Sequence, residues 1–192
     1  MKLYVNRPSP YGRKVLAAAH ELGLAGRLEI VAADPWSDPA ELLAATPLAK
    51  VPALVTDDGS VVVESTAICE VLDACSPAPR LFAGDRLRVL ARTGLAQGLI
   101  DAAFATVIER RRPAERQWQD WIDRQRRALD RTVTRIALPA EGRFDLGDLT
   151  LACALGYMDF RLPEVPWRQA RPDLARWFDA AAERPSMRAT KP

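Results

Sequence analysis

The chain has very little histidine and cysteine, and this shortage argues against most metal and redox sites. It contains one histidine, His20, and three cysteines, Cys69, Cys75 and Cys153, with no Cys-x-x-Cys pair. A zinc site built by the protein needs a cluster of such side chains, so we expect no metal. Unpaired cysteines are typical of a reducing compartment, and we expect a cytoplasmic protein.

An excess of one charge and long apolar runs are also missing. The 27 Lys and Arg residues nearly balance the 25 Asp and Glu residues, so nothing favours a nucleic-acid or membrane partner, despite the local run Arg110 to Arg112. No segment approaches the ~20 apolar residues of a membrane helix. The stretch Met1 to Arg7 becomes polar too early for a signal peptide. With 48% hydrophobic and 27% charged residues, the composition predicts an ordinary soluble globular protein.

One hairpin pattern organises the first half of the chain. Two β-branched runs, Ala53 to Thr56 and Val61 to Val63, flank the turn-forming residues Asp57 to Ser60, which predicts two antiparallel strands. Val51-Pro52 comes just before the hairpin. Glu64-Ser65 follows it and opens a helical pattern with serine as the expected N-cap residue. The ends of the hairpin should therefore present polar groups side by side.

The residues before this hairpin predict a β-α-β unit. Lys2 to Asn6 has a strand pattern, and Arg27 to Ala32 has a second one, which we expect to pair in parallel. Between them, Ser9 as N-cap and Pro10 at the first helical position predict a helix that ends at Gly23. Its charged residues Arg13 and Lys14 are expected on the helix surface.

The remaining pattern is almost entirely helical. One or two turns are expected over 40–45, a helix over 65–75, and a linker over 76–80, where two prolines prevent a helix. Periodic apolar residues then predict an antiparallel pair of long helices, a buried helix and a last amphipathic helix, over 85–112, 114–138, 150–160 and 172–183. Asp145 with Asp148 predicts an N-terminal capping box, and Phe144 with Leu149 a hydrophobic staple.

Four motifs resemble the glutathione transferases, and the resemblance covers essentially the whole chain: Ser9 to Gly12, Lys50 to Pro52, Glu64-Ser65 and Phe144 to Leu149. It implies an α/β thioredoxin-like N-terminal domain (1–75), a linker (76–84) and an all-α C-terminal domain (85–192). It also implies glutathione as co-substrate, no metal, a homodimer and a role in detoxification.

The resemblance assigns the thiol chemistry to Ser9. The glutathione thiol has a pKa of ~8.5, so an enzyme must favour the thiolate. A hydroxyl donor and the positive end of a helix both do this, and Ser9 at an N-cap supplies both. Tyr11 stays open as a competing hydroxyl, and simple helix capping is the alternative for Ser9. Because neither Ser9 nor Gly12 is a thiol, dithiol redox chemistry by this motif is excluded.

The remaining site residues are also implied by resemblance. A cis Val51–Pro52 bond leaves the Val51 backbone to pair with the cysteinyl part of glutathione. Ser65 and Glu64 bind the γ-glutamyl carboxylate and ammonium, and Lys50 binds the glycyl carboxylate. Helix capping is the simpler alternative for the Glu64-Ser65 pair, and exposure to solvent for Lys50. The expected electrophile pocket consists of Pro8, Phe104, Ile108 and Arg111.

Several charged and aromatic side chains of the helical half have two interpretations. Asp101 either contacts glutathione across a dimer interface or faces solvent. The run Arg110 to Arg112 is expected to be a solvated helix end rather than an anion site, because cations are favourable there. Trp118 and Trp121 are expected to pack in the core or at a helix corner.

Together these features predict a glutathione transferase that conjugates glutathione with a small hydrophobic electrophile. Two alternatives remain open on the same scaffold. The first is a non-catalytic glutathione-transferase-like binding or regulatory protein. The second is a glutathione-dependent isomerase or dehalogenase.

Overall fold

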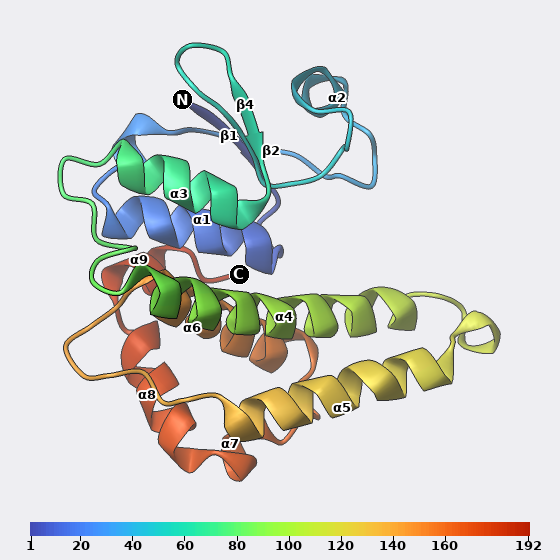
Figure 1. Ribbon diagram of the computed structural model, residues 1–192. Coiled ribbons are helices and arrows are strands. Elements are labelled where there is room, and N and C mark those ends of the chain that lie inside the picture. The colour runs from blue at the N-terminus through green and yellow to red at the C-terminus, as the bar shows by residue number, and fades with distance from the viewer. The chain divides into compact units, whose positions relative to one another are not determined.

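The structure is a computed structural model that describes every residue from Met1 to Pro192. It divides into two compact units (Figure 1): unit 1 is Met1–Gly84 with Pro185–Pro192, and unit 2 is Asp85–Arg184. The domain boundaries expected from the sequence stay a prediction. The last residues, which the sequence pattern assigns to the helical half, group with unit 1 in the structure.

Unit 1 contains a four-stranded mixed sheet in the order β2-β1-β3-β4. Its strands are β1 (Lys2–Val5), β2 (Glu29–Ala32), β3 (Ala53–Val55) and β4 (Val61–Val63). The first two pair in parallel, and β3 pairs antiparallel with both β1 and β4. The β-α-β unit and the hairpin expected from the sequence are therefore confirmed.

Helices cover both faces of this sheet. Helices α1 (Pro10–Glu21) and α3 (Ser65–Ala74) pack against each other, as Figure 1 shows. The short α2 (Ala40–Ala45) places Leu42 in a core cluster with Tyr4 and Ala53. Because neighbouring strand residues point to opposite faces, Leu3 and Tyr4 anchor two separate cores.

The C-terminal segment forms a short helix, α9 (Pro185–Ala189), on α1. The last helix that the sequence pattern predicted covers only 172–183. The Ser186 hydroxyl donates to Glu21 at 2.5 Å, and the Arg13 guanidinium donates to the Met187 carbonyl at 3.1 Å. Ser186 and Met187 are both buried. Residues far apart in the sequence thus complete the surroundings of α1.

This packing makes the predicted surface position of Arg13 and Lys14 wrong. Arg13 is 6% exposed and Lys14 is fully buried. Helix α1 contacts both α3 and α9, so little of its circumference faces solvent. The Lys14 ammonium donates to the Thr66 hydroxyl at 3.0 Å, which satisfies part of its hydrogen-bonding capacity.

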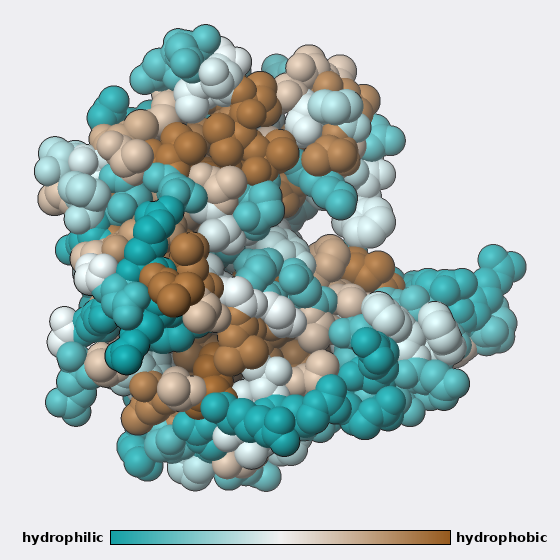
Figure 2. Space-filling view, viewed as in Figure 1, coloured by the Kyte–Doolittle hydropathy of each residue, from teal (hydrophilic) through white to brown (hydrophobic).

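Unit 2 is all helical. Its α-helices are α4 (Arg86–Arg110), α5 (Gln119–Arg135), α6 (Leu146–Arg161), α7 (Trp167–Ala170) and α8 (Pro172–Ala182). Helices α4 and α5 form the expected hairpin, although α5 begins later than predicted because Ala114–Arg116 form a separate 3-10 turn. Figure 2 shows a largely hydrophilic surface along α5, whereas α6 is buried over most of its length. None of the helices has the combined length and apolar character that crossing a membrane requires.

The start of α6 is held against α4 by the predicted capping box. Asp145 accepts from the backbone N–H of Gly147 and Asp148, and Asp148 accepts from the N–H of Asp145. Arg92 of α4 forms ion pairs with both carboxylates. A Cβ atom at Gly147 would lie 2.9 Å from the Cβ of Arg92, so glycine permits this close approach of the two helices.

Candidate functional site

Ser9 caps helix α1, as predicted. Its Oγ accepts from the N–H of Gly12 at 3.2 Å, and its backbone is extended. A serine hydroxyl has two acceptor lone pairs and one O–H donor, and the cap uses only an acceptor. Capping therefore leaves the O–H able to donate to another group. A Cβ atom at Gly12 would lie 3.3 Å from the Asn6 carbonyl oxygen, so glycine helps to keep this turn tight.

The starts of α1 and α3 lie at the same end of a parallel helix pair. Lys14, in the second turn of α1, bonds Thr66 in the first turn of α3. Just beyond the two C-termini, the Ser76 hydroxyl donates to the Leu22 carbonyl at 3.1 Å. The positive ends of both helix dipoles therefore lie on the same side of unit 1, and they favour bound anions there.

The segment before β3 leaves backbone groups outside the sheet. The Val51–Pro52 peptide bond is cis. The strand ladder begins only at Ala53, so the half-buried Val51 takes no part in it. An extended peptide pairs with backbone groups of this kind as an added strand does. Lys50, directly before Val51, is exposed.

Glu64 is the N-cap residue of α3, one position earlier than the serine expected from the sequence. Its carboxylate accepts from the N–H of Thr66 at 3.0 Å and of Ala67 at 3.2 Å. The Ser65 hydroxyl, on a side chain that is almost fully buried, donates to the same carboxylate at 3.0 Å. The backbone of Glu64 has φ 74°, in the left-handed region that residues other than glycine rarely adopt. Such strained residues cluster at ligand-binding sites.

The surroundings of Glu64 favour its charged form. Burial raises the pKa of this carboxyl group, but the Thr66 N–H, the Lys14 ammonium and the Ser65 hydroxyl lower it, and the net pKa is below its ordinary value. Lys14 is thus a contributor to the site that sequence reasoning missed. Its spacing from Pro10, Ala17 and Glu21, other buried residues of α1, places it on their helix face, and this was the available signal.

The residues expected in the electrophile pocket belong to both units. Phe104, Ile108 and Arg111 share one face of α4, with the two apolar side chains half-buried and Arg111 exposed. Pro8 is exposed in unit 1. The structure thus places three of the four on one surface, and their common pocket with Pro8 stays a prediction.

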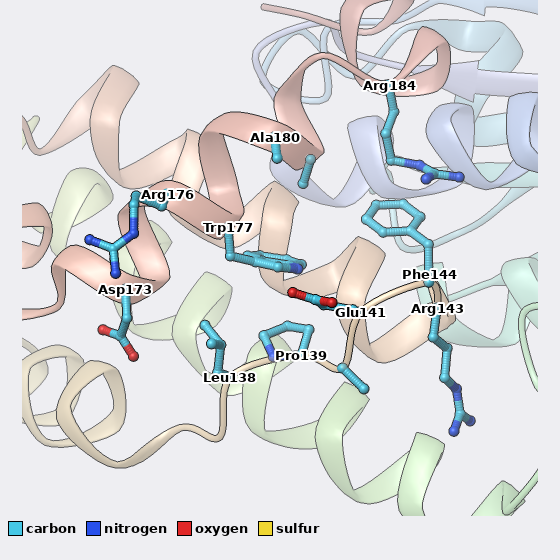
Figure 3. Close-up of a pocket in the computed structure, with 13 residues that line it drawn as sticks. Leu138, Pro139, Glu141, Arg143, Phe144, Asp173, Arg176, Trp177, Ala180 and Arg184 are labelled. Carbon is cyan, nitrogen blue, oxygen red and sulfur yellow. The ribbon is translucent and has the colours of Figure 1, made fainter.

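A cavity of about 440 Å³ lies within unit 2, between the segment after α5 and helix α8 (Figure 3). In this view Arg184 lies over the ring of Phe144, with 4.1 Å between the guanidinium carbon and the ring centroid, and Glu141 lies near Trp177. None of the predicted site residues lines this cavity. The chain has no group of three or more His, Cys, Asp or Glu side chains arranged to hold a metal ion.

Comparison with known proteins identifies the family. Residues 8–75 match the N-terminal domain of glutathione S-transferases, and residues 96–180 match the C-terminal domain. The uncharacterized GST-like protein YibF of Escherichia coli K12 is 31% identical, over all of this chain and 98% of its own length. A glutathione transferase family member from Pseudomonas fluorescens Pf-5, solved with bound glutathione, is 38% identical with a TM-score of 0.91, over all of this chain and 98% of its own. A second structure from that organism, with bound S-(propanoic acid)-glutathione, is 36% identical with a TM-score of 0.89, over all of this chain and 99% of its own. The chain belongs to the glutathione S-transferase family.

Proposed function

We propose that this protein binds glutathione and transfers its sulfur to a small hydrophobic electrophile, with Ser9 stabilising the thiolate. The observation that carries the proposal is the geometry of Ser9, whose cap leaves the O–H available at the positive end of α1. Two similar structures support the proposal. One was solved with bound glutathione, and the other with bound S-(propanoic acid)-glutathione.

In the proposed reaction the glutathione thiol loses its proton to solvent, and the Ser9 O–H donates a hydrogen bond to the resulting thiolate. The sulfur then attacks the electrophilic carbon. With a halogenated electrophile, a carbon–sulfur bond forms while the carbon–halogen bond breaks, and the halide leaves with the bonding pair. The reaction needs neither an oxidant nor a metal. Stabilising the thiolate matters because only a few per cent of a thiol with an ordinary pKa is ionised at neutral pH.

We further propose that Val51, Lys50, Glu64 and Ser65 hold the glutathione tripeptide. The Val51 backbone pairs with the cysteinyl residue, Lys50 neutralises the glycyl carboxylate, and Glu64 pairs with the γ-glutamyl ammonium. Without ligand, the Glu64 carboxylate accepts from backbone N–H groups at the start of α3. A ligand carboxylate that uses these N–H groups has to displace Glu64, which then becomes available to the ammonium.

A homodimer is proposed from the solvent-facing side of α4. This side carries three leucines at helical spacing, a pattern that usually marks a buried helix face. They are nevertheless exposed, by 77% for Leu87, 39% for Leu90 and 46% for Leu95. A second copy that covers this stripe removes apolar surface from water. Leu95→Glu should then convert a dimer to a monomer in light scattering, whereas a wild-type monomer would contradict the assembly. We also propose a cytoplasmic location and a detoxification role; the three cysteines form no disulfide, which supports a reducing compartment.

The decisive experiment measures binding and turnover separately in three proteins. Wild type, Ser9→Ala and Tyr11→Phe are tested for retention on immobilised glutathione and for turnover of 1-chloro-2,4-dinitrobenzene. A lost hydrogen bond to a charged group costs about 1.5–3 kcal/mol, so Ser9→Ala should lower kcat/KM about tenfold to a hundredfold at neutral pH.

Three outcomes contradict parts of the proposal. A larger loss in Tyr11→Phe than in Ser9→Ala would transfer the catalytic role to Tyr11. Retention without turnover of any electrophile would favour a non-catalytic binding protein. A folded protein that is not retained by glutathione would remove the proposal altogether.

A further inference from the structure

Lys14 is fully buried, whereas the other lysines of the chain are exposed or half-buried. A buried ammonium loses its hydration, which is unfavourable unless acceptors and negative charge replace the water. Apolar side chains of similar size often give a buried position equal or greater stability. Packing of α1 against its neighbours therefore does not account for a charge at this position.

The Lys14 ammonium lies against the first turn of α3, and both belong to unit 1. It donates to the Thr66 hydroxyl at 3.0 Å, and the backbone N–H of Thr66 donates to the Glu64 carboxylate, also at 3.0 Å. One residue therefore bonds the buried ammonium through its side chain and the carboxylate through its backbone. This geometry places a positive charge close to the position of the carboxylate. The lowered pKa of Glu64, to which Lys14 contributes, agrees with it.

The Glu64 carboxylate shows which chemical group the start of α3 holds. Donors from three consecutive residues, Ser65, Thr66 and Ala67, converge on it. Glu64 is exposed, so a solute can reach the same donors. A carboxylate of a ligand can therefore replace the Glu64 carboxylate, and it then has the same donors and the same neighbouring ammonium.

Lys14 acts in opposite directions on the two charges at the γ-glutamyl end of glutathione, where one carbon atom carries a carboxylate and an ammonium. Attraction favours the carboxylate at the start of α3, and repulsion keeps the ammonium away from it. The displaced Glu64 carboxylate then pairs with the ammonium. A ligand that keeps the ammonium but lacks the carboxylate brings only the unfavourable charge. Lys14 thus distinguishes such a ligand from glutathione.

We propose that Lys14 is a positioning residue that orients the γ-glutamyl end of glutathione and makes the site select peptides with a free carboxylate at that end. It acts through Thr66 and through its charge, without touching the ligand. The Ser65 hydroxyl, which donates to Glu64 without ligand, becomes available to the incoming carboxylate. This inference rests on the proposed function, because it concerns the tripeptide that the proposed site holds.

A simpler explanation is that Lys14 only joins α1 to α3. The two helices pack against each other (Figure 1), and the bond to Thr66 stabilises that contact. In that case, removal of the charge lowers stability and changes the affinity for every peptide by the same factor. The ratio of two affinities therefore separates a structural role from the proposed one.

The test compares glutathione with 4-aminobutyryl-cysteinylglycine, which lacks only the γ-glutamyl carboxylate. Isothermal titration calorimetry in oxygen-free buffer gives both affinities for wild type, Lys14→Met and the control Lys50→Met. We expect wild type to bind glutathione about tenfold to a hundredfold more tightly than the analogue. Lys14→Met, which removes the charge and keeps a long side chain, should reduce this preference several-fold. Lys50→Met should keep the preference, because both peptides carry the glycyl carboxylate that Lys50 is proposed to bind.

Equal affinity of wild type for the two peptides, with glutathione binding and turnover intact, would overturn the inference and leave the proposed function standing. A preference that is unchanged in Lys14→Met would also overturn the inference alone. A folded wild type that binds neither peptide would refute the proposed function and the inference with it. If Lys14→Met does not fold, Thr66→Val replaces it, because this variant removes the acceptor of the Lys14 ammonium. A several-fold smaller preference is expected there too, and a full preference would overturn the inference.

Discussion

Replacing Asp145 by alanine should destabilise unit 2 by more than the loss of a single surface contact would. This carboxylate is 1% exposed and accepts from the N–H of Gly147 at 2.9 Å and of Asp148 at 3.2 Å. It also forms ion pairs with Arg92 at 3.1 Å and Arg143 at 2.9 Å. The substitution removes a helix cap and one member of a buried ion pair together.

The magnitude follows from these contacts. Loss of an N-cap costs about 0.5–2 kcal/mol, and removal of one partner from a buried pair costs about 3–5 kcal/mol. The terms do not add in full, because one carboxylate makes all the contacts. Asp148 still pairs with Arg92, whose side chain is 29% exposed and so remains partly solvated. We therefore expect a loss of about 3 kcal/mol, a large fraction of a typical domain stability of about 5–15 kcal/mol.

Thermal unfolding followed by circular dichroism measures this loss. The Tm should fall by about 6–12 °C if the whole chain unfolds together, and by about twice that if unit 2 melts alone. Asp145→Ser keeps a capping oxygen and should recover about 1 kcal/mol. Arg143→Gln removes only a half-exposed partner and should cost less than about 1 kcal/mol. A fall of less than about 3 °C in Asp145→Ala would refute the assigned role of this buried carboxylate.

Three further predictions concern the other contacts. The lowered pKa of Glu64 means that its stabilisation is present above its unfolded pKa and is lost as the pH falls through its folded pKa. The difference in Tm between wild type and the less stable Glu64→Gln should therefore be larger at pH 7 than at pH 3. A difference that does not change with pH would contradict this. Gly147→Ala should cost about 1–3 kcal/mol in chemical denaturation because its Cβ has no room, whereas Gly98→Ala, with open space, should stabilise by up to about 1 kcal/mol. Ser186→Ala should cost about 1 kcal/mol by removing a buried hydrogen bond that holds α9 to α1, and an unchanged unfolding midpoint would contradict that role.

The features that the sequence predicted well depend on neighbouring residues. Ser9-Pro10 specifies a helix start, Asp145 with Asp148 specifies a capping box, and the turn at Asp57 to Ser60 specifies a hairpin, because each needs only a few consecutive residues. The structure contains all three. The order of helices and strands along the chain followed from them and from the apolar periodicity.

The sequence did not predict which charged residues are buried, because their burial depends on segments that are distant in the chain. Lys14 and Arg13 are residue types that usually lie on exposed helix surfaces, yet both are buried in a helix that packs against α3 and α9. The contact between Arg13 and the Met187 carbonyl joins residues at opposite ends of the chain. Helical periodicity gives the spacing of residues along one helix, but it does not state how many neighbours surround that helix.

The cap of α3 shows why a strong local rule gave the wrong residue. Serine ranks among the best N-cap residues and glutamate does not, so Ser65 was the expected choice. In the structure, Glu64 reaches backbone N–H groups and also receives the Ser65 hydroxyl. The ammonium of Lys14 adds favourable charge. A propensity measured on isolated helices does not include these tertiary partners.

In both units, a basic side chain of a neighbouring helix balances the charge of an acidic helix cap. In each, a basic side chain near the second turn of one helix meets the acidic cap region of a parallel neighbour: Lys14 beside Glu64 and Thr66, and Arg92 beside Asp145. A buried or half-buried capping carboxylate needs an opposite charge, because removing it from water is otherwise unfavourable. An acidic cap at the start of a buried helix therefore predicts a cation on the adjacent helix. The sequence assigned the cap of α3 to Ser65, so this condition points to Lys14 only once the structure shows Glu64 in the cap position.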